Sequence, residues 1–61
     1  MARPDLAIAE YDKALKANRN SASAYYGRAM AEQQKGEKSD ADDDIETARK
    51  IDPDIEKNFG R

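Results

Sequence analysis

Acidic side chains crowd one short stretch of the chain, residues 40–44, which reads Asp-Ala-Asp-Asp-Asp. Oxygen ligands at this density could bind a divalent cation such as Ca²⁺. An EF-hand loop also needs a glycine at its sixth position and a glutamate at its twelfth. Counting from Asp40, these positions hold Ile45 and Ile51. The stretch therefore predicts the solvated first turn of a helix, where carboxylates favour the positive end of the dipole, and no metal site.

Catalytic chemistry finds little support in the residue types. The 61 residues include no histidine and no cysteine, the usual bases and nucleophiles near neutral pH. Carboxylates such as Glu10 and Asp44 are plentiful, but nothing in the sequence indicates that they are desolvated. The three glycines are isolated and form no phosphate-binding loop. We expect no enzyme and no cofactor, and the absence of cysteine fits a reducing compartment such as the cytoplasm.

Composition and charge exclude further classes of function. Hydrophobic residues make up 38% of the chain and charged residues 39%, with a net charge of −2. The basic residues alternate with acids and form no basic stripe, so no nucleic-acid partner is expected. No apolar run approaches the roughly 18 residues of a membrane span. The composition predicts one small, soluble, helix-prone domain, and a core of this size supplies only about 3–5 kcal/mol.

Three helical segments are predicted, separated by short turns. The first opens at Pro4, which suits the first helical turn, and runs to about residue 17. Ser21 is a predicted N-cap for a second helix over about 22–35, which Gly36 ends. No stretch shows the alternating pattern of a strand, and short turns favour antiparallel neighbours. The expected fold class is all-α, built from antiparallel helical hairpins.

The third helix is expected to begin near Ser39, whose hydroxyl and Asp42 three residues on match a capping-box pattern. It should end at about Ile51, before Pro53, because the residue preceding a proline is biased away from helix. Phe59 lies in a short tail that could begin a fourth helix.

A small–large–small trio of residues occurs twice, at an interval of 34 residues. Its copies are Ala7, Tyr11 and Ala14, and then Ala41, Ile45 and Ala48. Alanines at this helical spacing let two helices approach closely, while the larger residue fills the space between them. A fixed interval indicates that one supersecondary unit has been copied.

These residues resemble the tetratricopeptide repeat (TPR) family, whose 34-residue unit is a pair of antiparallel helices. One complete unit matches residues 22–55, with Tyr25 at its opening aromatic position, Ala29 at its small position and Pro53 at its closing proline. Residues 5–20 resemble the second helix of a preceding unit. Residues 56–61 form a tail or the start of a capping helix. The resemblance thus covers about one and a half repeats.

Several positions depart from the family pattern. Arg28 replaces the usual leucine and Glu32 the usual tyrosine, which makes the middle helix more polar. Ile8 and Leu15 of the first segment correspond to Asp42 and Arg49 in the third. Terminal repeats of a solenoid carry a polar outer face, so the sequence predicts the C-terminal part of a longer array, with a stand-alone miniature as the alternative.

The resemblance implies that the first helix of a unit lines a concave groove for a peptide or partner helix. The groove residues would be Ser23, Tyr26, Gly27, Met30 and Gln33, with Gln34 near the edge. Tyrosine and methionine give adaptable contact area, and Gly27 would let a partner's backbone approach closely. Tyr26 and Met30 could instead pack against a missing repeat. None of these positions is a lysine, arginine or asparagine that could grip a terminal carboxylate.

The predicted function is a protein–protein interaction scaffold that presents this groove to a protein or peptide. The alternative is a structural miniature or truncated repeat with no ligand, which self-associates through an uncovered face formed by Ile8 and Leu15. A homo-oligomer would follow from the alternative. The two differ in the residues on which binding depends, Tyr26 and Met30 in the first case and Leu15 in the second.

Overall fold

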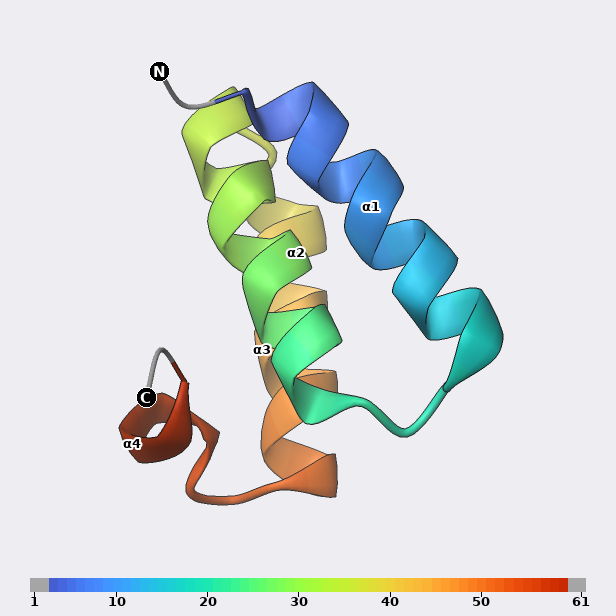
Figure 1. The fold of residues 1–61 in the computed structure, drawn as a ribbon. Coiled ribbons are helices and arrows are strands. Elements are labelled where there is room, and N and C mark those ends of the chain that lie inside the picture. Colours follow the sequence, from blue (N-terminus) through green and yellow to red (C-terminus); the bar gives the residue numbers. More distant parts are fainter. Residues whose placement is uncertain (1–2, 60–61) are drawn as a thin grey trace.

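Three long helices and one short helix form the structure, a computed structural model that describes residues 3–59. They are α1 (Pro4–Ala17), α2 (Ala22–Lys35), α3 (Lys38–Ile51) and α4 (Ile55–Asn58). Figure 1 shows successive long helices running in opposite directions, with α2 packed against both α1 and α3. The described residues contain no strand. The expected all-α class with antiparallel helical hairpins is confirmed.

Local signals set most of the helix ends. Pro4 occupies the first turn of α1, and the Ser21 side chain accepts a hydrogen bond from the Ala24 amide at 3.2 Å. Gly36 ends α2 with φ +86°, the left-handed conformation that glycine adopts without strain. Its amide donates to Gln33, and the Glu37 amide donates to Glu32 at 2.8 Å, which closes a Schellman motif. Each of these helix-end predictions is confirmed.

The expected start of α3 agrees to within one residue, but the expected capping role of Ser39 was wrong. The helix begins at Lys38, and Glu37 precedes it without a side-chain cap. The Ala41 amide already donates to the Glu37 carbonyl at 3.0 Å, so Ser39 lies inside the first helical turn and does not cap it. The other end agrees with the prediction, because α3 stops at Ile51 before Pro53. The predicted fourth helix is the single turn α4, with Phe59 at its C-cap.

Alanine dominates the core. The buried apolar side chains are Leu15, Ala22, Ala24, Ala29, Ala31, Ala41, Ala48 and Ile55. No large side chain in residues 3–59 is fully buried, whereas Leu6, Met30 and Ile51 are exposed. Small side chains let helix backbones approach closely but remove little apolar area from water each. Contacts outside this alanine core must therefore supply a large share of the stability.

The two copies of the repeated trio have different surroundings. Ala41 and Ala48 of α3 have no exposed surface, and neither has Ala29 of α2. In α1, Ala7 is half-buried and Ala14 is exposed. The alanines of the α3 copy are thus buried more completely than those of the α1 copy. Within the described part of the chain, no helix has the length and apolar character to cross a bilayer.

Candidate functional site

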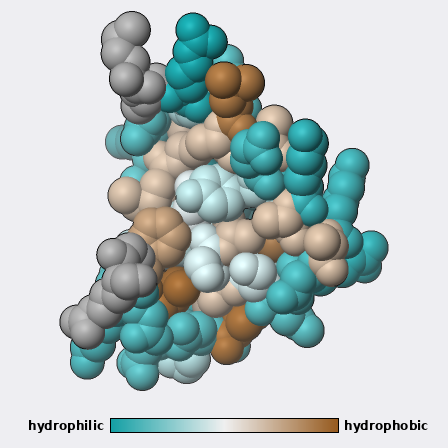
Figure 2. Space-filling model, in the orientation of Figure 1, coloured by the Kyte–Doolittle hydropathy of each residue, from teal (hydrophilic) through white to brown (hydrophobic). Residues whose placement is uncertain are grey.

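The five predicted groove residues all lie on α2 but differ in exposure. Ser23 and Gln33 are exposed, and Met30 retains 43% of its surface. Tyr26 is half-buried, and Gly27 is buried. Figure 2 shows one face of the molecule on which weakly polar and apolar side chains gather in the middle, with hydrophilic residues around them.

Tyr26 packs within the chain against Phe59. The two ring centroids are 4.8 Å apart and the planes meet at 65°, an edge-to-face arrangement that aromatic pairs favour. This contact ties the C-terminal end of α4 to α2, and both rings belong to the small cluster built on Ala22, Ala48 and Ile55. Tyr26 therefore holds the C-terminal segment in place, and it is only partly exposed.

Gly27 has a different role from the expected one. A β-carbon at this position would overlap the Tyr11 ring of α1. The missing side chain of Gly27 thus makes room for Tyr11, and α1 takes the space that a partner's backbone was expected to occupy. The expectation for Gly27 is corrected accordingly, because the close approach that it allows is between α1 and α2.

A hollow of about 260 Å³ opens beside this contact. It is lined by Arg3, Pro4, Ala7, Tyr11, Gly27, Met30, Ala31, Gln34 and Phe59. Gly27 and Met30 belong to the predicted groove, whereas Ser23, Tyr26 and Gln33 do not line the hollow. The α1 residues and Phe59 were missed as site residues, because only the packing of α1 on α2 brings them together. We call this surface the α1–α2 hollow.

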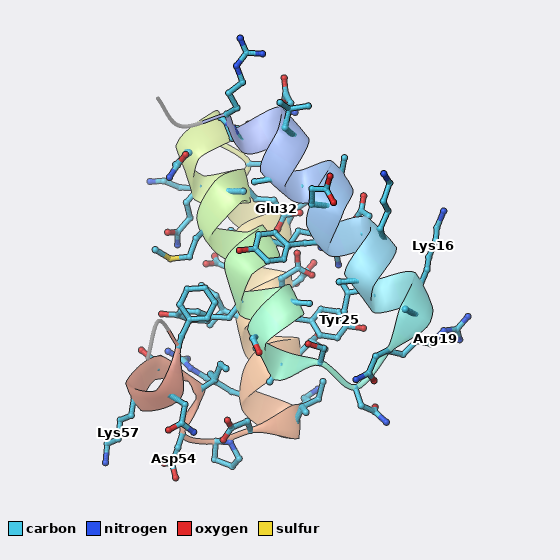
Figure 3. All side chains as sticks on the ribbon, in the orientation of Figure 1. Lys16, Arg19, Tyr25, Glu32, Asp54 and Lys57 are labelled. Atoms are coloured by element: carbon cyan, nitrogen blue, oxygen red, sulfur yellow. The ribbon has the colours of Figure 1, made fainter. Side chains whose placement is uncertain are left out.

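The predicted self-association face is largely covered. Leu15 is buried, with 7% of its surface exposed, and Ile8 is half-buried. The expectation that Leu15 is uncovered was wrong, because α2 packs on this side of α1. Beside Leu15 lies an open hollow of about 520 Å³ that Lys16, Arg19 and Tyr25 also line. Lys16 and Arg19 extend away from the helices near the end of α1 (Figure 3).

Arg28 joins all three long helices through ion pairs. Its Nε and Nη2 donate to the two carboxylate oxygens of Asp44 on α3 at 2.9 and 2.8 Å, and its Nη1 donates to Asp12 on α1 at 2.7 Å. The guanidinium carbon also lies 5.5 Å from the centre of the Tyr25 ring. Hydrogen bonds to Asp44, despite partial burial, raise the pKa of Arg28 above its ordinary value. Arg28 therefore cross-links the three long helices.

Glu32 lies one turn further along α2 and is buried, with 7% of its surface exposed. Burial raises its pKa from 4.5 to about 8, and a hydrogen bond to Asp44 adds to the shift. Burial disfavours ionisation of Asp44 as well, but hydrogen bonds from Arg28 and Glu32 outweigh it and lower the pKa of Asp44. Burial and the neighbouring Asp44 thus both favour the protonated form of Glu32.

This polar network, Asp12–Arg28–Asp44–Glu32, was not predicted from the sequence. A signal was present, since Asp12 and Asp44 each lie 16 residues from Arg28, one before it and one after it. In a chain of helices joined by short turns, such symmetric spacing places both carboxylates beside the same point on the middle helix.

Comparison with known proteins gives no family. A scan against models of protein families found no match, and neither did a search of curated proteins or a search of solved structures. A functional assignment therefore depends on the residues and their geometry.

Proposed function

We propose that this chain is a protein-interaction module of TPR type, without catalysis, that binds a peptide or partner helix at the α1–α2 hollow. The observation that carries the proposal is the hollow itself, in which the exposed side chain of Met30 stands beside the Tyr11 and Phe59 rings. Aromatic and methionine side chains provide contact area that adapts to different ligands. The trio that is repeated after 34 residues and the antiparallel hairpins support the assignment to the TPR type.

The size of the hollow indicates the kind of contact. About 260 Å³ accommodates one or two side chains of a ligand and is too small to bury a whole drug-sized molecule. Among the lining residues, Arg3 and Gln34 can hydrogen-bond a peptide backbone, while Ala7, Ala31 and Met30 can contact apolar side chains. A peptide that inserts an apolar anchor and continues along α2 past Gln33 fits this arrangement.

A display library of random peptides, selected against the immobilised chain, tests the proposal. We expect selected peptides to share an apolar anchor. Met30→Glu should weaken their binding by about tenfold or more, because it places a charge beside the anchor. Ile51→Glu, at an exposed position on α3, is the matched control and should leave binding unchanged. Peptides that bind both variants and the parent chain equally would refute a site at the α1–α2 hollow.

Self-association is the second candidate, and exposed apolar surface on α1 favours it. Leu6 retains 57% of its surface, and Ala14 of the repeated trio is exposed. Both belong to α1, whose trio is less completely buried than the trio of α3. On this alternative a second copy of the chain would cover α1, through Leu6 and Ala14 instead of Leu15.

A further inference from the structure

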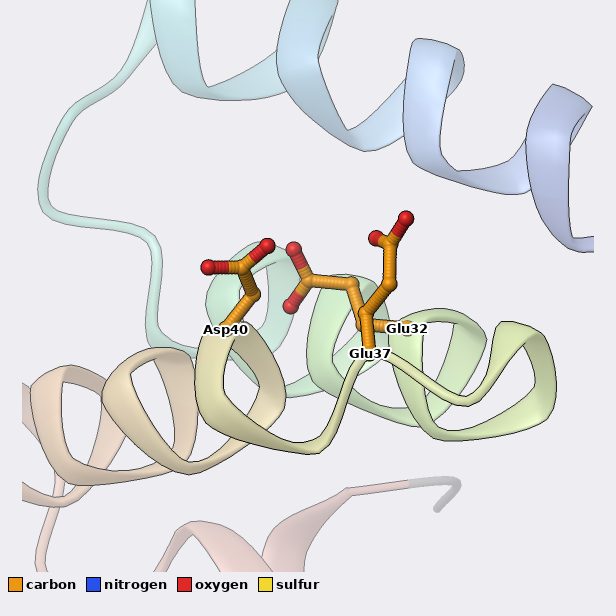
Figure 4. Close-up of side chains that lie close together, drawn as sticks. All are labelled: Glu32, Glu37 and Asp40. Atoms are coloured by element: carbon orange, nitrogen blue, oxygen red, sulfur yellow. The ribbon is translucent and has the colours of Figure 1, made fainter.

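Three carboxylates converge where α2 turns into α3. Glu32 comes from the last turn of α2, Glu37 precedes α3 and Asp40 lies in its first turn. One oxygen of each side chain lies within 4.8 Å of the others. Figure 4 shows the Glu32 side chain directed toward Asp40, with the Glu37 side chain beside it. The acidic run 40–44 fails as an EF-hand by itself, but Asp40 has carboxylate neighbours from outside that run.

Glu32 distinguishes this cluster from an ordinary acidic surface. Glu37 and Asp40 stand at the start of α3, where carboxylates favour the positive end of the helix dipole. Glu32 has no such explanation, because it lies near the end of α2 and is more than nine-tenths buried. No hydrogen-bond donor in residues 3–59 reaches its Oε1 atom, which is itself buried. A buried oxygen without a partner is costly unless a proton or a cation satisfies it.

Few positive charges balance the cluster. Lys35 Nζ is 3.4 Å from Glu37 but nearer to Asp5, at 3.0 Å, and its ammonium is shared between the two. Arg28, on the Glu32 side, already donates to Asp12 and Asp44. The described basic side chains therefore neutralise only part of the charge of Glu37 and Asp40, and a cation bound at the cluster would displace the proton of Glu32.

We propose that Glu32, Glu37 and Asp40 form a binding site for a divalent cation, with Ca²⁺ preferred. All three ligands are oxygens, which suit Ca²⁺ and Mg²⁺ better than zinc. Two oxygens on one cation cannot be further apart than twice the metal–oxygen distance. This limit is about 4.6–5.2 Å for Ca²⁺ and about 4.0–4.2 Å for Mg²⁺. Oxygens no more than 4.8 Å apart fit the Ca²⁺ limit, and water would complete the coordination. Ca²⁺ is preferred because it accepts several carboxylates in a flexible geometry, whereas Mg²⁺ demands a near-ideal octahedron and keeps several waters.

Calorimetric titration of the whole chain with CaCl₂, at fixed ionic strength, tests the site. With three protein ligands we expect a dissociation constant of about 10⁻⁴–10⁻³ M. Glu32→Gln should weaken Ca²⁺ binding by about tenfold or more, while its amide still donates to Asp44 and preserves the fold. Asp40→Asn, at an exposed position, should weaken binding as well without affecting the core. Asp54→Asn removes the same charge from an exposed position between α3 and α4 and is the control.

Loss of binding in the two site variants, with binding unchanged in Asp54→Asn, supports the site. Two results would overturn it. One is no saturable Ca²⁺ binding up to about 10 mM, well above the expected range. The other is an equal affinity in the parent chain and all three variants, which indicates diffuse attraction to an acidic surface. Circular dichroism of each variant establishes that the helices are formed.

Discussion

Arg28 and Asp44 form a two-point ion pair across the interface of α2 and α3, with hydrogen bonds of 2.9 and 2.8 Å. Both partners are largely withdrawn from solvent, since their side chains are 23% and 10% exposed. A paired arrangement of this kind fixes the register of two helices as well as their contact. In a bundle whose core is mainly alanine, it identifies the polar network as a principal link between α2 and α3.

The first prediction concerns removal of Arg28. Arg28→Met should destabilise the chain by about 2–3 kcal/mol, because it leaves the buried Asp44 carboxylate without its partner. Asp12→Asn should cost less than about 1 kcal/mol, since the Asp12 side chain is 48% exposed and an exposed pair contributes little. Urea unfolding followed by circular dichroism measures both. Equal losses of stability in the two variants would mean that the Arg28–Asp44 pair contributes no more than the Arg28–Asp12 pair.

Stability should depend on pH through Glu32. Its folded pKa is raised to about 8, from 4.5 in the unfolded chain, so folding takes up a proton between these values. The contribution of Glu32 is complete below about pH 4.5 and is lost as the pH rises toward about 8. Asp44 acts in the opposite direction. Its pKa is lowered, so its contribution is present above 3.8 and is lost as the pH falls through the folded value.

Together these two groups predict greatest stability at mildly acidic pH. Glu32→Gln removes the titrating group but keeps the donor to Asp44, so the variant should exceed the parent chain by more than about 1 kcal/mol at pH 8. Urea midpoints at several pH values, measured with a chelator present, provide the comparison. If the urea midpoints of the two proteins change with pH in the same way, Glu32 is not the group that causes the pH dependence of stability.

Gly27→Ala should destabilise the chain by about 1–3 kcal/mol, because the added methyl group overlaps the Tyr11 ring. On helix propensity alone the same change would stabilise the chain by about 1 kcal/mol. The sign of the change in the free energy of unfolding therefore distinguishes the overlap with Tyr11 from the effect of helix propensity. In a Tyr11→Ala background the clash is absent, and Gly27→Ala should then be neutral or favourable. Thermal unfolding of the four proteins in this double-mutant cycle measures the coupling. Additive effects would argue against the contact.

Leu15 and Leu6 should respond differently to the same substitution. Leu15→Lys buries a charge at a position that is 7% exposed, and we expect a loss of about 3 kcal/mol, close to the whole stability of a chain this small. Leu6→Lys, at an exposed position, should change stability by less than about 0.5 kcal/mol. Circular dichroism melts test both. Sedimentation of Leu6→Lys also tests self-association, since a lower mass than that of the parent chain would favour the second candidate function.

Helix boundaries were predictable because their signals act locally. Proline at the start of α1, the Ser21 hydroxyl and the left-handed Gly36 each act within a few residues of their own position. The lack of a capping role for Ser39 was not predictable in the same way. The Schellman motif at Gly36 allows the next helix to begin almost at once, before the capping pattern at Ser39 can apply.

The candidate site was less predictable, because it depends on how two helices meet. Met30 could be identified from its face on α2, but the position of Tyr11 over Gly27 follows from the packing of α1 on α2. The sequence also identified Arg28 and Glu32 as unusual, but only the packing of the helices establishes which side chains they contact. Local patterns specify which face a residue occupies, whereas tertiary packing decides what it contacts.

The most direct test of a binding site at the α1–α2 hollow is backbone amide NMR of the labelled chain, titrated with a peptide from the display selection. We predict that the largest shift changes occur at Gly27, Met30 and Phe59, which line the hollow. Changes centred on Lys16 and Arg19, at the other hollow, would contradict this site.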